Sequence, residues 1–292
     1  MKSILTLIFT TVFFSNSFIN HFSYDEKYVQ IITNIYKGDK FIFVKMRREG
    51  ERIKAKYFAS KEFGNTVYER YSEWSKGKNI ILACGAAYFD WGIPKFDYKK
   101  ATPVGITIDN GNVVSYKKSD RGNGLVIVYA TGGIACSNIK QGKLKMKCSG
   151  ESFIFNVNQD KDLNRFIECS KEVNATVFQQ HLLAYDGKLN QLTNFSTEKK
   201  ERRFLVVGYD ENNKLFHIVI HYPTSSSLKD AAEKVFNFLM DQELTKIEFM
   251  VNLDTGYQDV FKLYDTNGSE KNDIKGTEPL TSSVNLLVYY YE

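Results

Sequence analysis

The last third of the chain constrains the fold most strongly, because it sets long apolar runs beside an amphipathic helix. The segments, in order, are a hairpin at 204–209 and 215–221, a helix at 228–239, and a strand at 247–253. The hairpin turns on Asp210-Glu211-Asn212-Asn213, residues that favour turns. Ser227 with Asp230 is typical of a capped helix start, and the helix repeats its apolar residues at helical spacing. This order predicts a helix packed on an antiparallel sheet.

The earlier part of the chain consists of short β-type runs separated by turn signals, with two further helical segments. Asn110-Gly111 is the strongest hairpin signal, because both turn positions tolerate positive φ. Helices are predicted from Ser60 to Gly77 and over 160–174. Strands are predicted at 28–35, 40–46, 79–84, 104–108, 113–116, 125–130, 153–157, 177–185, 260–264 and 284–290. The fold class is therefore α+β, with mixed, mostly antiparallel sheets and a few packed helices.

Length and composition fit one globular unit. The chain has 292 residues, of which 43% are hydrophobic, enough to bury a core without a metal or a disulfide. We expect a single domain over residues 18–292. A net charge of +5 without a clustered basic face argues against nucleic-acid binding. No Gly-rich phosphate loop, dinucleotide fingerprint or Ser-His-Asp order is present, so we expect no cofactor and no metal. The oligomeric state stays open.

Residues 1–17 have the order of a secretory signal: a lysine, an apolar run over 4–14, and small or polar residues at 15–17. The apolar run is short for a bilayer span, although an uncleaved anchor helix is the alternative. No later segment is apolar enough to cross a membrane. We therefore expect a secreted or periplasmic protein.

If the protein is exported, its four cysteines can form disulfides, because oxidising compartments favour these bonds. Cys84, Cys136, Cys148 and Cys169 allow three pairings. Cys136 and Cys148 are the closest in sequence and could staple a hairpin, which leaves Cys84 for Cys169. Four free thiols are the alternative. No spacing fits a zinc site.

The first candidate site is the end of the strand over 247–253, where Asp254-Thr255-Gly256 follows. An acid at a strand end, beside a glycine that lets a backbone approach closely, is a common way to place a carboxylate next to a ligand. A turn-forming aspartate that accepts hydrogen bonds from the following amides is the alternative.

The second candidate is Gly85-Ala86-Ala87-Tyr88-Phe89-Asp90, which follows the strand over 79–84. Small residues leave room for a substrate, and Tyr88 and Phe89 could form a stacking wall for a sugar ring. The alternative is close backbone packing with the aromatic side chains in the core.

Taken together and in this order, these motifs resemble the phosphodiester glycosidase family, also described as the uncovering-enzyme-like family. Over residues 80–290, the similar stretches are Gly85–Phe89, Pro103–Ile106 with Asn110-Gly111, Arg203–Gly208, Leu228–Leu239, Leu253–Gly256 and Val284–Val288. The resemblance implies hydrolysis of a sugar phosphodiester to a sugar and a phosphomonoester.

The same resemblance implies the roles of the site residues. Asp254 and Arg203 would be catalytic, with Asp254 as acid, base or ligand orienter and Arg203 as the phosphate contact. The substrate-binding residues would be Tyr88, Phe89, Asp90, Gly105, His181, Thr255 and Gly256.

The leading hypothesis is a secreted hydrolase of a sugar phosphodiester or related glycoconjugate with a divergent site. Gly85 stands where the family has Asn, Thr255 where it has Gly, and Arg203 lies five rather than four residues before Gly208. These departures favour the second hypothesis, a non-catalytic carbohydrate- or partner-binding protein on the same scaffold. The third is an exported structural protein without a small-molecule site.

Overall fold

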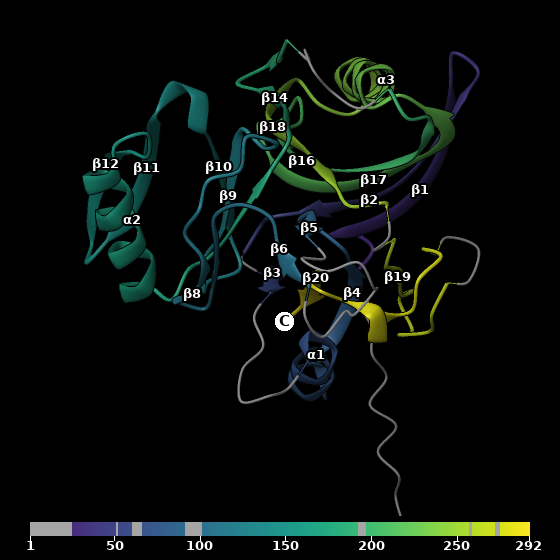
Figure 1. The fold of residues 1–292 in the computed structure, drawn as a ribbon. Helices are drawn as coiled ribbons and strands as arrows, with labels where there is room; N and C mark the ends of the chain where they lie inside the picture. Colours follow the sequence, from purple (N-terminus) through teal and green to yellow (C-terminus); the bar gives the residue numbers. More distant parts are fainter. Residues whose placement is uncertain are drawn as a thin grey trace, which may run out of the picture.

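A seven-stranded antiparallel sheet forms one layer of the protein (Figure 1). The computed structural model describes residues 25–50, 52–59, 66–90, 101–191, 197–256, 259–271 and 275–292. The sheet's strands, in spatial order, are β1 (Val29–Tyr36), β2 (Asp39–Arg47), β17 (Leu215–Ser226), β16 (Lys200–Tyr209), β18 (Lys246–Leu253), β14 (Leu182–Tyr185) and β15 (Lys188–Leu189). Helix α3 (Leu228–Gln242) covers one face, and Ser227 caps it by accepting from the Asp230 N–H.

A second sheet packs on the other face of the first. Its strands, in order, are β19 (Phe261–Leu263), β4 (Asn79–Cys84), β20 (Leu286–Tyr291) and β3 (Ile53–Phe58). Side chains of both sheets, such as Val207, Leu253 and Leu287, share one buried cluster. Helix α1 (Val67–Ser75) lies outside this sheet, where Val67 and Tyr71 pack under Phe58.

A third sheet carries a helix-and-hairpin layer (Figure 1). Its strands, in order, are β10 (Ile134–Asn138), β9 (Gly124–Val128), β13 (Thr176–Gln180), β7 (Thr107–Asp109) and β8 (Asn112–Ser115). The hairpin of β11 (Lys143–Cys148) and β12 (Glu151–Asn156) and the helix α2 (Asp160–Glu172) close its core. The short elements are β5 (Phe89–Asp90), β6 (Thr102–Pro103), η1 (Ile139–Gln141) and η2 (Leu280–Ser282).

The α+β class is confirmed, and so are most predicted hairpins, including the Asn110-Gly111 turn at positive φ. Two boundaries differ. The predicted strand over 177–185 is two strands in different sheets, because the chain leaves β13 after Gln180 and joins the first sheet at Leu182. Both halves are buried on both faces, so periodicity could not reveal the break.

The start of the first helix also differs from the prediction. Thr66 is the N-cap of α1: its side chain accepts from the Glu69 N–H, and the Glu69 carboxylate accepts from the Thr66 N–H in a capping box. Ser60, the predicted cap, lies outside the described residues, as does the predicted signal over 1–17. Among the helices described, none has both the length and the hydrophobicity needed to cross a membrane.

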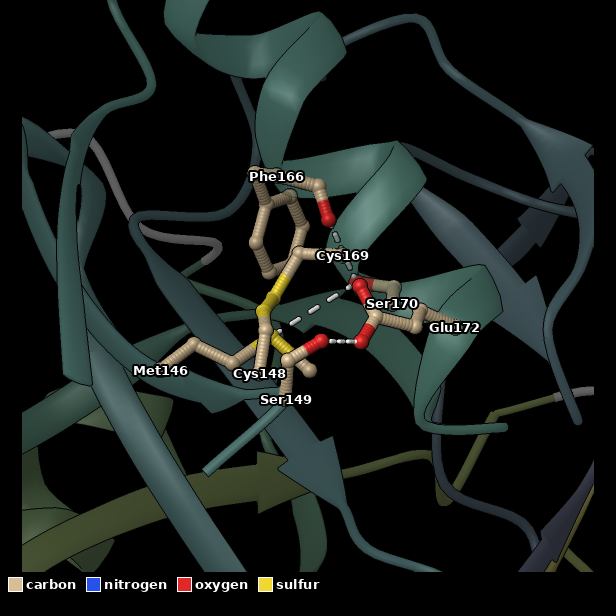
Figure 2. The surroundings of a disulfide bond; sticks show 7 residues. All are labelled: Met146, Cys148, Ser149, Phe166, Cys169, Ser170 and Glu172. Atoms are coloured by element: carbon tan, nitrogen blue, oxygen red, sulfur yellow. Dashed lines mark hydrogen bonds between the residues drawn. A yellow bond between two sulfur atoms is a disulfide. The ribbon is translucent and has the colours of Figure 1, made fainter. Parts of the chain in front are cut away.

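One disulfide joins Cys148 at the end of β11 to Cys169 on α2, with a Cα–Cα distance of 5.7 Å (Figure 2). The suggested pairing of Cys136 with Cys148 and Cys84 with Cys169 is therefore wrong. Cys136 lies in the ladder of β9 and β10 and Cys84 at the end of β4, and both are free thiols. Ser149 donates to the Glu172 carboxylate beside the bridge, as Figure 2 shows, so hairpin and helix are joined twice.

Reducing the Cys148–Cys169 bridge should loosen the helix-and-hairpin layer and leave the two large sheets folded. A bridge with a sequence separation of 21 residues contributes about 3 kcal/mol in the chain-entropy account. The double variant C148S/C169S should lose about that much unfolding free energy in urea titrations. Wild-type protein treated with dithiothreitol should lose about the same amount, whereas C148S/C169S should not respond to the reductant. A further loss of stability on reduction of C148S/C169S would contradict the observed pairing.

Candidate functional site

The stretch after β4 is held in place by a buried asparagine of the C-terminal region. Asn285 accepts hydrogen bonds from the Ala86 and Ala87 N–H groups at 3.0 and 2.9 Å, and its Nδ2 donates to the Ala87 carbonyl at 2.9 Å. The Gly85 N–H donates to the Val260 carbonyl at 2.9 Å. Ala86 and Ala87 have no exposed surface. Their small side chains let this backbone sit against the strand ends, as the packing alternative proposed.

The end of β18 lies against the same stretch. The Ala86 carbonyl accepts from the Asp254 N–H at 3.2 Å and from Gln180 Nε2 at 2.7 Å. The ends of β4, β13 and β18, one from each sheet, therefore meet at a single carbonyl oxygen. The two candidate stretches that the sequence singled out are side by side.

Tyr88, Asn252 and His181 form the centre of the candidate site. Asn252 Nδ2 donates to the Tyr88 hydroxyl at 2.6 Å, and the Asn252 N–H donates to the His181 carbonyl at 3.1 Å. The rings of Tyr88 and His181 meet edge to face, with centroids 5.4 Å apart. Asn252 is buried, and its Oδ1 accepts no hydrogen bond from a described residue. An acceptor left unpaired in this way is costly unless a ligand or water satisfies it.

Asp254 is a buried carboxyl group with a raised pKa. Its side chain is 3% exposed, and burial raises its pKa from 3.8 to about 6. The Gly256 N–H, which donates to Oδ1 at 2.8 Å, and the charge of Lys200 oppose this rise. The hydrogen bond to Gly256 is the one that the turn-forming alternative predicted. A carboxyl group with a pKa of about 6 can also exchange a proton with a substrate near neutral pH.

Arg203 is engaged in a buried ion pair. Its Nη2 donates to Asp259 Oδ1 at 3.0 Å, and its guanidinium carbon lies 4.3 Å from the centroid of the Phe261 ring. Arg203 has no exposed surface, and Asp259 is 2% exposed. Asp259 also accepts from the Thr277 N–H at 2.9 Å. Arg203 thus ties β16 to the second sheet.

Arg202 is the arginine on the Tyr88 side of the first sheet. Neighbours on a strand point to opposite faces, and Arg202 shares the face of Phe204, whose partner across the ladder is Asn252. Its guanidinium donates to the carbonyls of Glu198 at 2.6 Å and Ser226 at 3.3 Å. The charge of Arg202 lowers the pKa of Tyr88, although burial raises that pKa more.

Arg121 and Lys200 are two further cations near the centre of the site. Burial, together with the charges of Arg121 and Arg202, lowers the pKa of His181 to about 4, so His181 is neutral at pH 7. A Cβ added to Gly256 would lie 3.5 Å from Lys200 Nζ, so the ammonium group is beside the Asp254 loop. The Lys200 ammonium is paired with the Glu198 carboxylate at 3.3 Å, whereas Arg121 and Arg202 place positive charge beside His181, which suits an anionic group.

The other predicted binding residues lie around this centre. Thr255 donates its hydroxyl hydrogen to the Glu201 carbonyl at 3.1 Å, and Phe89 lies in β5, opposite Pro103. Of Asp90 the structure describes the backbone, in the same strand. Gly105 has φ +90° and faces Gln179, whose Oε1 would be 2.5 Å from an added Cβ, so this glycine is needed for close packing.

Sequence reasoning gave no role to Arg202, Asn252, Gln180, Asn285 and Lys200. The pair Arg202-Arg203 carried a usable signal, since one of two adjacent strand residues must face each side. Which one faces the site is set by the ladder with β17, in which Arg202 lies opposite Tyr222 and Arg203 opposite His221, and the sequence does not show that register. Among the described residues, no cluster of three or more His, Cys, Asp or Glu could hold a metal ion.

No protein-family model matches the chain, and a search of curated proteins also finds no match. Among solved structures, a hypothetical protein from Synechocystis is similar with a TM-score of 0.49 and 11% identity, over 90% of this chain and 62% of that one. The catalytic domain of zebrafish N-acetylglucosamine-1-phosphodiester alpha-N-acetylglucosaminidase, auto-inhibited by its pro-peptide, gives a TM-score of 0.48 and 13% identity, over 90% of this chain and 82% of that one. Both are distant structural likenesses, so function has to be inferred from the site residues themselves.

Removing the partner of Arg203 should destabilise the fold. Asp259→Asn leaves the guanidinium buried without its counter-charge, which typically costs about 3–5 kcal/mol. Urea unfolding at pH 7 should show a loss of that order. Glu198→Gln, at an exposed side chain, is the matched control. A loss below about 1 kcal/mol for Asp259→Asn would contradict the buried pair.

Asp254 should lower stability at neutral pH. Because its folded pKa is raised to about 6 from 3.8, the folded protein holds a proton in that window that the unfolded chain has released, so stability falls as pH rises through it. Asp254→Asn removes this term, and the variant should be more stable than the wild type by about 2–3 kcal/mol at pH 7.

The gain from Asp254→Asn should shrink to near zero at about pH 4. Urea titrations of both proteins from pH 4 to 7.5 measure the difference, and contributions from the buried histidines cancel in it. A variant that is less stable than the wild type at pH 7 would show that the carboxylate is well solvated or paired.

Proposed function

We propose that this protein is a hydrolase that cleaves a sugar phosphodiester, or a related glycoconjugate, at the site around Asp254. The observation that carries the proposal is Asp254, a residue that is 3% exposed and whose carboxyl pKa burial raises to about 6, with the Lys200 ammonium beside its loop. Strongly perturbed titratable groups of this kind concentrate at functional sites. The substrate class comes from the resemblance of the motifs, and the site chemistry is compatible with it.

The cations Lys200, Arg202 and Arg121 favour an anionic substrate. Each exerts its charge on Asp254 or His181. A phosphodiester carries one negative charge, which arginine can bind through its forked donors. We assign the phosphate contact to Arg202 in place of Arg203, because the Asp259 carboxylate neutralises the charge of Arg203, whereas the Glu198 and Ser226 carbonyls that Arg202 donates to are uncharged.

Asp254 would act as the general base. In the hydrolysis, a water oxygen bonds to the anomeric carbon of the sugar, and the bond from that carbon to the phosphate oxygen breaks. The water gives its proton to the Asp254 carboxylate, and the electron pair of the broken bond leaves with the phosphomonoester. A phosphomonoester is a weak base, with its second pKa near about 6, so its departure needs no acid. A base with a pKa of about 6 is ionised at neutral pH and strong enough to take a proton.

The remaining predicted residues would hold the sugar. Tyr88 and His181 offer ring edges and polar atoms, and the unpaired Oδ1 of Asn252 would accept from a sugar hydroxyl. Phe89, Asp90, Gly105, Thr255 and Gly256 are proposed as the surrounding wall. Neutral His181 can donate or accept a hydrogen bond without repelling the cations beside it.

We also propose that the protein is exported. The Cys148–Cys169 disulfide supports this, because such bridges persist in oxidising compartments. The signal-like order of residues 1–17 agrees with it.

The second candidate function is carbohydrate binding without turnover. It is favoured by the engagement of Arg203 with Asp259 and by the hydrogen bond from Gly256 to Asp254, which gives the carboxylate a structural partner. In this case Asp254 orients a sugar and transfers no proton.

Hydrolysis is tested with α- and β-linked sugar-1-phosphodiesters of glucose, galactose, mannose and N-acetylglucosamine. We expect release of the free sugar from at least one, with kcat/KM falling below about pH 6 as Asp254 takes up its proton. Asp254→Asn should lower kcat by about 10²–10⁴-fold, the range of a general base. Folded state is checked by circular dichroism, and Asp160→Asn, on the exposed start of α2, is the matched control.

Calorimetric titration with the same compounds separates the two candidates. Binding without sugar release at any pH from 5 to about 9 would establish the non-catalytic function. Neither binding nor release would overturn both. Release that persists in Asp254→Asn would overturn the role of the carboxyl.

A further inference from the structure

The strand β1 forms one edge of the seven-stranded sheet (Figure 1, purple). Among the described strands it pairs with β2 alone, over eight residues and without a register shift. Its sequence, VQIITNIY, contains no charged residue and no proline. Proteins usually protect a sheet edge with charges, prolines, bulges or covering loops, because an unprotected edge pairs with other strands.

The other edges of the three large sheets are shorter, and one of them is covered. β15 has two residues, β19 three, β8 four and β10 five. β3 has six, but it contains Lys54 and Lys56, and its Ala55 N–H donates to the Gly132 carbonyl at 3.0 Å. Of the described edges of these sheets, β1 is therefore the longest, and its strand has none of these protecting features.

Alternate residues of β1 turn their backbone groups away from β2. The Arg47 N–H donates to the Tyr28 carbonyl at 2.8 Å, so Tyr28 and every second residue after it exchange hydrogen bonds with β2. The residues between them face outward. The first of these is Val29, whose N–H donates outside the ladder, to the Asp25 carbonyl at 3.2 Å.

Ile31, Thr33 and Ile35 continue this outward series. Their backbone N–H and carbonyl groups have no partner among the described residues. Ile35 is 73% exposed, the largest fraction for any large hydrophobic residue in the described part of the chain. The edge thus offers a row of donors and acceptors, together with apolar surface, to an added strand.

β1 is held in place by its contacts with both cores. Ile31 packs against the cluster between the two sheets, and Ile32 packs on the α3 side. The ring of Tyr36 lies 5.7 Å from that of Phe238, centroid to centroid, and its hydroxyl donates to the Asp241 carboxylate. The edge is therefore preformed, which lowers the entropy lost when a strand binds to it.

We propose that two copies of this chain pair antiparallel through β1, about a two-fold axis at Thr33. Thr33 then lies opposite Thr33 of the partner subunit, and Ile31 lies opposite Ile35 of the partner subunit. Residues directly opposite share a face, so the exposed Ile35 gains an apolar, β-branched neighbour. The same surface serves both copies, as a two-fold interface requires, and the two seven-stranded sheets join into one.

The two ends of β1 favour this register. Pairing centred nearer the start of the strand would need the Val29 N–H, which already donates to the Asp25 carbonyl. Pairing centred nearer the end would run into the turn at Lys37 and Gly38, where φ is +49° and +84°. The register centred on Thr33 pairs every outward residue that has no partner among the described residues.

Charges at the two ends of the strand are complementary in this register. Lys37, whose side chain is 70% exposed, comes opposite the start of β1 in the partner subunit. The turn before that start contains Asp25, Glu26 and Lys27, a net charge of −1. Because the pairing is two-fold, this contact of opposite charges occurs twice. These charges favour a second copy over an unrelated strand.

The proposed pairing leaves the candidate hydrolase site uncovered. β18, which ends before Asp254, is the fourth strand from β1 and lies about 19 Å away at the usual spacing of strands. The dimer therefore does not depend on the proposed activity.

The test is sedimentation of the full chain by analytical ultracentrifugation over about 1–100 µM, where small interfaces associate. We expect a reversible dimer. Thr33→Lys and Thr33→Glu should each weaken it by more than about tenfold, because like charges lie directly opposite each other. An equimolar mixture of the two variants should form a heterodimer, because opposite charges then face each other. Ile154→Lys, at an exposed isoleucine of β12, is the matched control and should dimerise normally.

Thr33→Pro separates pairing from folding. The Thr33 N–H points outward, so proline removes no hydrogen bond to β2 and blocks the partner strand. We expect a monomer with the circular dichroism spectrum of the wild type. A wild type that stays monomeric, a dimer unaffected by Thr33→Pro, or charged variants that stay monomeric when mixed would overturn the proposal. Dimerisation that appears only after deletion of residues 1–24 would also overturn it, because that segment would then occupy the edge.

Discussion

The hydrogen bonds at one backbone segment, Ala86-Ala87, bring the candidate site together. The Ala86 carbonyl accepts from the Asp254 N–H and from Gln180, and Asn285 bonds the amides of both alanines. Three strands from three sheets end at this point. Without these bonds, the loops after β4 and β18 would have no common anchor, and Tyr88 would lose its contact with Asn252. Buried polar groups of this kind fix one arrangement because every alternative leaves one of them unpaired.

The close approach of these strands explains the electrostatics of the site. Small side chains at 86 and 87 allow tight packing, tight packing excludes water, and exclusion of water raises the pKa of Asp254. The neighbouring Arg203 does not cancel this effect, because Asp259 holds its guanidinium at 3.0 Å. One arginine thus stabilises the contact between sheets while its neighbour on the strand, Arg202, faces the site. A functional role explains why a carboxyl group that lowers stability is kept, whereas a purely structural role does not.

Much of the fold could be predicted because local signals were strong. The Asn110-Gly111 turn, the Ser227 cap and the alternating runs of β16 to β18 follow from φ preferences, side-chain acceptors and apolar spacing. The break at His181 could not be predicted, because both flanking strands are buried on both faces. The disulfide could not be assigned either, since Cys148 and Cys169 meet through the packing of α2 on β11, not through proximity in sequence.

Several residues of the candidate site could be predicted from the sequence, but the long-range contacts that join them could not. An acid after an apolar strand and small residues after another indicated Asp254 and Tyr88, and the structure brings both to the same place. The choice between Arg202 and Arg203 depends on the pairing of β16 with β17, and the contribution of Asn285 depends on a contact between positions 199 residues apart. Such long-range relations leave no local pattern.

The most direct test is a ¹³C NMR titration of the Asp254 side-chain carboxyl in the folded protein, assigned by comparison with Asp254→Asn. If the carboxyl is buried as described, its midpoint is near pH 6. A midpoint at or below the ordinary value of 3.8 would show a solvated or ion-paired carboxylate and would contradict the account.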